Sequence, residues 1–180
     1  MYSNSIFRMI FSPAKIAKIK QSLKWGDLMF PGTLYETHVK TKNLDRAISF
    51  YKKLGMDLAH IIEERKVAFF WFDKNHKKEQ MLGVWEVPNE EFHKNHFAFR
   101  ISYEEMLNAR QWLLNKGISP RAAFGLDPVE PMVQTWTPSA NLYFYDLDGN
   151  SLEFLCLLHE KKNVKRDVMY LSEWERISSV

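Results

Sequence analysis

One helix can be recognised directly in the stretch Asn43-Leu-Asp-Arg-Ala-Ile-Ser-Phe-Tyr-Lys-Lys-Leu-Gly55. Asparagine is a preferred residue at the N-terminal cap of a helix, and glycine is typical of the position after its last turn. Between these ends the apolar residues recur at helical spacing and form one stripe: Leu44, Ala47, Tyr51 and Leu54. The stretch therefore predicts an amphipathic helix over residues 44–54.

Segments typical of β-strands surround this helix. A strand is predicted before it, over Leu34–Thr41. Three further runs rich in β-branched and aromatic residues follow it; they are Asp57–Ile62, Val67–Asp73 and Gln80–Val87. The first half of the chain therefore has the order β-α-β-β-β.

The second half repeats this order. A strand is predicted over His96–Ile101, and Ser102 with Glu105 forms a capping box for a helix that ends at Gly117. The later β-rich runs are Leu142–Asp146 and Ser151–Leu157, joined by the tight turn Asp148-Gly149, with a weaker run between Pro120 and Thr137. An internal repeat of two β-α-β-β-β halves is thus predicted.

Two stretches carry a resemblance to a known family. The helix Asn43–Gly55 resembles the first helix of the vicinal oxygen chelate superfamily, and Asn141-Leu-Tyr-Phe-Tyr-Asp-Leu-Asp-Gly-Asn-Ser-Leu-Glu-Phe154 resembles its last hairpin. This superfamily contains glyoxalase I, fosfomycin-resistance thiol transferases, extradiol dioxygenases and bleomycin-binding proteins. One departure is Leu147, where the family turn usually has proline. The resemblance implies an α+β fold of two βαβββ modules, the glyoxalase-like fold.

The expected domain organisation follows from the extent of this resemblance. The glyoxalase-like domain is expected over residues 33–158, with modules at about 33–90 and 94–158. Residues 1–32 form a basic N-terminal extension and residues 159–180 a C-terminal extension, both expected to be short and helical. The charged segment after His159 predicts a strand end that runs into a solvated helix.

Composition excludes several classes of protein. The chain has 180 residues, 46 % of them hydrophobic, and its longest apolar run, Val67–Phe72, is too short to span a membrane. A single cysteine, Cys156, excludes an intramolecular disulfide and suits a cytoplasmic protein. Residues 31–158 carry 15 basic and 17 acidic side chains, so no electrostatic surface for nucleic acid is expected.

The positive charge is concentrated at the N-terminus. Residues 1–30 carry five basic side chains and one acidic one. This pattern fits a transit peptide or a contact with an anionic surface. A solvated amphipathic helix, or a start that is over-extended ahead of Met29, fits it better, because the segment has no continuous apolar region and no clear cleavage site.

The resemblance also implies a metal site. The ligands of the superfamily lie on the first strand of each half and on the last strand of the second half. Glu36 stands five residues before Thr41, as His96 stands five before Ile101, and the third ligand position falls on Glu153. Two carboxylates and an imidazole suit one divalent metal ion such as Fe, Mn, Ni, Co or Zn. A fourth family ligand position falls on Gly83, which has no side chain.

Other interpretations of these three residues remain open. Taken singly, Glu36 fits a solvated residue at a strand edge, and His96 fits a packed histidine. Glu153 is harder to explain in this way, because its neighbours Leu152 and Phe154 indicate a buried strand. A buried carboxylate is costly unless it is paired or bound to a metal.

Further residues are candidates for contact with a substrate. His38 shares a strand face with Glu36 and could replace it as ligand, bind a substrate oxygen or shuttle protons; we expect it to contact the substrate. Apolar lining is expected from Trp85, Phe99 and Trp136, although aromatic residues are more often part of a core. Cys156 is expected to be a packed thiol.

Two functions from different classes follow from the resemblance. The first is a metal-dependent lyase or isomerase, dioxygenase or thiol transferase that binds neighbouring oxygens of a small molecule and stabilises an oxyanion or enediolate. Glu153 or Glu36 would then double as general base. The second is a metal-free protein that binds an antibiotic, as in bleomycin resistance. Because an open sheet leaves edges and an apolar face uncovered, a homodimer is expected in either case.

Overall fold

The structure is a computed structural model, and it describes residues 34–72, 78–160, 165 and 167–177. The N-terminal extension predicted over residues 1–32 lies outside the described residues. Residues 35–180 form one compact unit. In the part of the chain that is described, no helix is long and apolar enough to cross a membrane.

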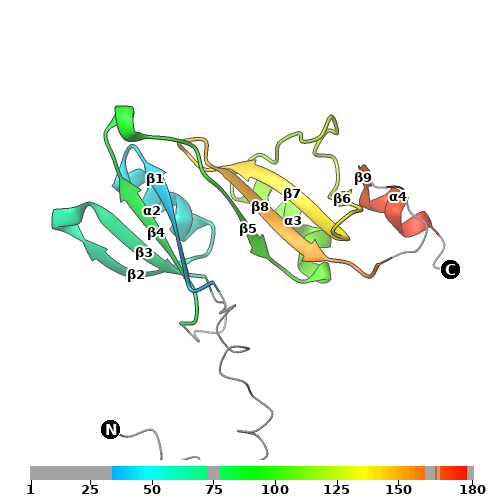
Figure 1. Cartoon of the computed structure of the whole chain (residues 1–180), viewed down its shortest axis with the longest axis horizontal. Coiled ribbons are helices and arrows are strands. Elements are labelled where there is room, and N and C mark those ends of the chain that lie inside the picture. The colour runs from blue at the N-terminus through cyan, green and yellow to red at the C-terminus, as the bar shows by residue number, and fades with distance from the viewer. Residues whose placement is uncertain (1–33, 73–77, 161–164, 166, 178–180) are drawn as a thin grey trace, which may run out of the picture. The chain divides into compact units, whose positions relative to one another are not determined.

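The first module is a mixed four-stranded sheet with one helix (Figure 1). Its strands follow the order β1-β4-β3-β2, in which β1 runs parallel to β4 and the other pairs are antiparallel. Its elements are β1 (Glu36–Thr41), α2 (Leu44–Lys53), β2 (Asp57–Ile62), β3 (Val67–Trp71) and β4 (Met81–Glu86). Short 3-10 helices lie at Glu63–Arg65 and Asn89–Glu91.

The second module repeats this topology. Its strands follow the order β5-β8-β7-β6-β9, and β5 again runs parallel to the last strand of its module, β8. Its elements are β5 (His96–Arg100), α3 (Tyr103–Asn115), β6 (Met132–Gln134), β7 (Ser139–Tyr145) and β8 (Ser151–Leu157). The predicted α+β fold of two βαβββ modules is therefore confirmed.

The helix ends are stabilised as the sequence predicts. The Asn43 side chain accepts a hydrogen bond from the Arg46 backbone N–H at 2.9 Å. Ser102 and Glu105 form the predicted capping box. The glycine after α2, Gly55, has a φ of +95°, in the left-handed region that other residues rarely adopt. These local signals explain why both helices lie within one residue or so of their predicted positions.

The weaker predicted run between Pro120 and Thr137 contains only the three-residue strand β6. Outside this strand the segment makes one isolated bridge to the sheet, from Pro120 to Phe144. Proline cannot donate to a strand ladder, and Pro128 and Pro131 occupy the segment before β6. The loop is therefore long, and it runs over the sheet without extending it.

The C-terminal extension differs from its prediction. It contributes strand β9 (Val168–Tyr170), which pairs with β6, and helix α4 (Leu171–Arg176). A helix is present as predicted, but the prediction that it is solvated fails on one face, where Leu171 and Trp174 are only 3 % and 4 % exposed. These residues stand three apart and share one helix face, which packs on the core cluster.

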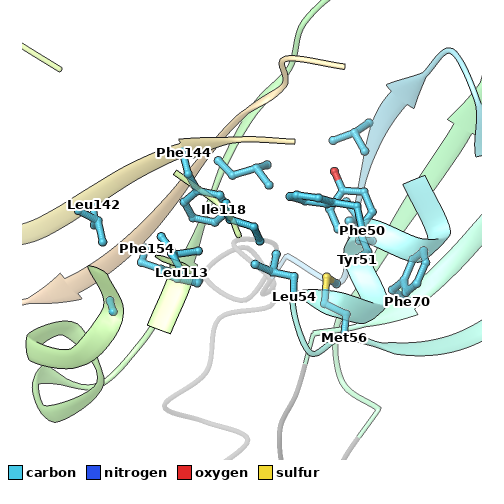
Figure 2. Close-up of a cluster of buried hydrophobic side chains, with 14 of the residues drawn as sticks. Phe50, Tyr51, Leu54, Met56, Phe70, Leu113, Ile118, Leu142, Phe144 and Phe154 are labelled. Atoms are coloured by element: carbon cyan, nitrogen blue, oxygen red, sulfur yellow. The ribbon is translucent and has the colours of Figure 1, made fainter. Parts of the chain in front are cut away.

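One continuous cluster of apolar side chains includes both modules. Figure 2 shows Leu54 and Met56 of the first module in this cluster with Ile118 and Phe144 of the second. Each helix covers one face of its own sheet, and the opposite face of the first sheet carries polar and aromatic side chains together, among them Glu36, His38, Phe69 and Trp85. Cys156 lies in the cluster, and burial raises the pKa of its thiol, as expected of a packed cysteine.

The turn between β7 and β8 joins the two modules by hydrogen bonds. Tyr51 on α2 donates from its hydroxyl to Oδ2 of Asp146 at 3.0 Å. Thr41 donates to the carboxylate of Asp148, and Asn150 donates to the backbone oxygen of Lys40. Burial of Tyr51, together with the nearby Asp146 carboxylate, holds the pKa of this phenol well above its ordinary value.

Candidate metal and substrate site

Strand β1 places two polar residues on the sheet face that α2 does not cover. Val39 and Thr41 are buried beneath the helix, so the alternate residues Glu36 and His38 lie on the opposite face. The predicted sharing of one face is confirmed, because Nε2 of His38 lies 2.8 Å from Oε1 of Glu36. The two side chains are 43 % and 32 % exposed for His38 and Glu36, respectively.

The imidazole of His38 is held at both nitrogens. The indole Nε1 of Trp85 donates to Nδ1 of His38 at 2.7 Å. Because an indole N–H can only donate, Nδ1 must accept, and neutral His38 then carries its proton on Nε2. That proton is directed to Glu36. The imidazole therefore orients the carboxylate and has no unoccupied nitrogen in this arrangement.

Gly83 provides the space that this ring needs. It lies directly opposite His38 in the parallel pairing of β1 with β4. A Cβ atom at Gly83 would lie 2.3 Å from Nδ1 of His38, far closer than atoms can approach. The His38 ring thus occupies the space that a side chain at Gly83, the position of the fourth ligand in the family, would need.

The second module brings His96 and Glu153 together on the uncovered face of its sheet. Nδ1 of His96 lies 3.0 Å from the backbone oxygen of Ser151, and Nε2 lies 3.2 Å from Oε2 of Glu153. Since a carbonyl oxygen only accepts, Nδ1 carries a proton; Nε2 then holds a lone pair in the neutral imidazole and donates to Glu153 in the protonated one. A metal-binding histidine is held in the same way, by its second ring nitrogen.

Glu153 is the buried member of this pair. Its side chain is 6 % exposed, against 53 % for His96. Burial raises the pKa of Glu153, while hydrogen bonds from Tyr143 and His96 and the charge of Arg121 oppose that rise. Burial and the neighbouring Glu153 carboxylate likewise raise the pKa of Tyr143, whose hydroxyl accepts a hydrogen bond from Gln134 at 2.8 Å.

The remaining predicted residues lie in three different surroundings. Trp85 is joined to His38, as described above. Phe99 lies on the opposite face of β5 from His96, where its ring packs 5.0 Å from that of Phe97. Trp136 lies in the turn between β6 and β7 and is 47 % exposed. The structure thus brings only Trp85 to one of the two polar pairs.

The three predicted metal ligands fall into two separate groups. His96 and Glu153 form one pair, and Glu36 pairs with His38 instead. Within the described residues, no three histidine, cysteine, aspartate or glutamate side chains are grouped so as to hold a metal ion. The donors that a divalent metal accepts are nevertheless present, because His96 offers an imidazole nitrogen and Glu153 a carboxylate at one point. A metal ion bound at this pair would need a third protein ligand from elsewhere.

Three residues beside Glu153 were missed by the sequence reasoning. Tyr143 lies directly opposite Glu153 in the antiparallel pairing of β7 with β8, and Ser151 lies opposite Tyr145. Counting outward from the Asp148-Gly149 turn would have found both positions. Arg121 reaches this face from the loop after α3, and no local pattern in the sequence signals its position.

Two modules that each carry a carboxylate and an imidazole on one sheet face define an α+β protein of the vicinal oxygen chelate type. The chain belongs to the Glyoxalase/Bleomycin resistance protein/Dioxygenase superfamily, whose family model matches residues 35–154. The comparison with curated proteins gives no match.

Solved structures show the same fold. An integron cassette protein from the mobile metagenome of the Halifax Harbour sewage outfall is 30 % identical, with a TM-score of 0.59 over 71 % of this chain and 100 % of that one. Lactoylglutathione lyase from Agrobacterium tumefaciens is 19 % identical, with a TM-score of 0.55 over 70 % and 94 % of the two chains. A glyoxalase/bleomycin resistance protein/dioxygenase from Nocardioides is also 19 % identical, with a TM-score of 0.55 over 86 % and 99 %.

Proposed function

We propose that this protein is a divalent-metal-dependent enzyme that binds two neighbouring oxygens of a small molecule and stabilises an oxyanion or enediolate. The observation that carries the proposal is the state of His96. Its Nδ1 is held by the Ser151 backbone oxygen, and its Nε2 faces the buried carboxylate of Glu153. This arrangement presents a nitrogen and an oxygen donor together, as a metal centre requires.

The proposed ligands are His96, Glu153 and Glu36, with Glu36 supplied by a second copy of the chain. Two features support a shared site. The described part of a single chain groups no three ligand-type side chains, and both polar pairs lie on sheet faces that the helices leave uncovered. A homodimer that joins the first module of one copy to the second module of the other would complete the triad twice.

The chemistry divides between the metal and the protein. When bound, the divalent ion supplies positive charge to the two substrate oxygens. Glu153 is the proposed general base once substrate binding loosens its bond to the metal, because burial then raises the pKa of its carboxyl group and strengthens it as a proton acceptor. Glu36 could serve instead, if the substrate lies nearer to the other module. His38, fixed by Trp85, orients Glu36 and faces the substrate.

A metal-free binding protein of the bleomycin-resistance type is the alternative. It is favoured by the same absence of a three-residue cluster within one chain's described residues. We place the protein in the cytoplasm, where a free buried thiol such as Cys156 stays reduced.

Metal content separates the two functions. The full chain is purified without chelator, and its metal is quantified by mass spectrometry next to the variants His96→Ala and His60→Ala. His60 is a matched control, because it is an exposed histidine on β2 away from both pairs. About one divalent ion per chain, lost in His96→Ala and kept in His60→Ala, is expected. If the wild type holds no ion above background, even after incubation with Mn²⁺, Fe²⁺, Ni²⁺, Co²⁺ or Zn²⁺, the proposal of a metal-dependent enzyme is contradicted.

A further inference from the structure

Arg121 is a positively charged residue near the His96–Glu153 pair. Its backbone N–H donates to the backbone oxygen of Tyr143 at 2.8 Å, and this bond connects the loop after α3 to strand β7. Its guanidinium carbon lies 5.0 Å from the ring centre of Tyr143 and 4.8 Å from that of Tyr145. These tyrosines stand two apart on β7, so Arg121 lies over the same sheet face as Glu153.

The guanidinium retains hydrogen-bonding capacity. Nη1 donates to the backbone oxygen of Ala122 at 3.0 Å, and Nη2 donates to Oγ of Ser151 at 2.8 Å. Nε is buried without a partner. Because each terminal nitrogen carries two hydrogens, one N–H on each remains for a ligand.

Among the described residues, no carboxylate lies within 4.0 Å of the Arg121 guanidinium. Glu153 lies on the same sheet face, and the charge of Arg121 lowers the pKa of its carboxyl group, but the two side chains form no ion pair within 4.0 Å. A guanidinium that remains charged at all physiological pH values favours an anion.

We propose that Arg121 binds an oxyanion group of the substrate, a carboxylate or a phosphorus oxyanion, next to the His96–Glu153 pair. The proposal rests on the proposed function, because it names the class of substrate for that site. Ser151 connects the two parts: its Oγ accepts from Arg121, and the same atom lies 3.2 Å from Nδ1 of His96. The Ser151 hydroxyl would thus connect an anion bound at Arg121 to the imidazole of His96, the proposed metal ligand.

The test uses metal-free full-length protein, so that it does not depend on metal binding. Acetate, methylphosphonate and neutral acetamide are titrated separately while NMR follows the Nε–H signal of Arg121 and the imidazole signals of His96. A saturable shift of both with at least one of the two anions, and none with acetamide, is expected. Comparison of the two anions shows which group is preferred.

Variants establish that Arg121 is responsible. Arg121→Gln should weaken anion binding by about tenfold or more, and Arg121→Lys, which keeps the charge but loses the fork, by less. Arg110→Gln is the matched control, since Arg110 also donates to a backbone oxygen, that of Pro128, but from helix α3. It should bind as the wild type does.

Three results would overturn the proposal. They are no saturable shift with either anion, equal shifts with acetamide, and unchanged affinity in folded Arg121→Gln. If Arg121→Gln does not fold, the wild-type Nε–H signal decides alone. If the anions do not bind but the protein holds its metal, only the proposed role of Arg121 is excluded. If the anions bind but the protein holds no metal, the proposed metal-dependent function is excluded.

Discussion

The two modules carry the same residue types on equivalent sheet faces but use them differently. In the first module, His38 is bonded at both nitrogens and its partner Glu36 is 32 % exposed. In the second, His96 is bonded to the backbone through one nitrogen and directs the other at Glu153, which is 6 % exposed. Under the proposed function the two pairs therefore have different tasks: the second pair presents donors to the metal, and in the first pair His38 orients the Glu36 carboxylate.

The largest expected effect is loss of the imidazole of the second pair. His96→Ala should reduce metal affinity by more than the roughly 10- to 100-fold that removal of an outer hydrogen-bond partner costs. His38→Ala should stay within that smaller range, because His38 acts through Glu36. Competition with a chromogenic chelator measures both affinities.

The next comparison is between the carboxylate and the imidazole of the first pair. Glu36→Ala should be more severe for metal binding than His38→Ala, and Lys40→Ala, on the same strand, should have little effect. If His38→Ala is instead the more severe variant, the metal ligand on β1 is His38, two residues after Glu36.

The next effect concerns the turn that joins the modules and leaves both pairs intact. Asp146→Ala removes the acceptor for the buried Tyr51 hydroxyl and for three hydrogen bonds within the turn, from the backbone of Asp148 and from the backbone and side chain of Asn150. A loss of about 2–4 kcal/mol in the free energy of unfolding is expected. Urea denaturation followed by circular dichroism measures it. Metal affinity of the folded variant should be unchanged, and a parallel loss would show that the turn also shapes the site.

Much of this architecture could be predicted, because local signals specify it. Asn43 and Ser102 begin the two helices, and the alternation of β1 predicts the common face of Glu36 and His38. The position of Arg121 could not be predicted, since a long loop without a periodic pattern carries it to β7. The buried face of α4 was missed for a different reason: the charges after His159 conceal a helix with only two core residues, Leu171 and Trp174.

A smaller effect is expected from filling the space above Gly83. Gly83→Ala places a methyl group against the His38 ring, and relief of that overlap should cost about 1–3 kcal/mol of stability. The ring must move, so its hydrogen bond to Trp85 should break. Thermal unfolding reports the stability, and the fluorescence of Trp85 reports the contact. An unchanged melting temperature would show that the ring does not occupy this position in solution.

The smallest effect is expected from Trp85→Phe. The variant keeps an aromatic ring but removes the N–H that holds Nδ1 of His38, at a cost of about 1 kcal/mol. Neutral His38 then keeps only the contact with Glu36 to select its tautomer. Nitrogen NMR of the imidazole should show Nε2 protonated in the wild type and an increased share of the Nδ1-protonated tautomer in the variant. A mixture in both would mean that Trp85 does not select the tautomer.

The most direct test of the account is a crystal structure of the metal-loaded protein. We predict one ion about 2.0–2.2 Å from Nε2 of His96 and from a carboxylate oxygen of Glu153, with Glu36 of a second copy as the third protein ligand. His38 should remain bonded to Glu36 and Trp85. A metal–nitrogen distance near 2 Å to His38, or a metal-soaked crystal with no ion at His96, would contradict it.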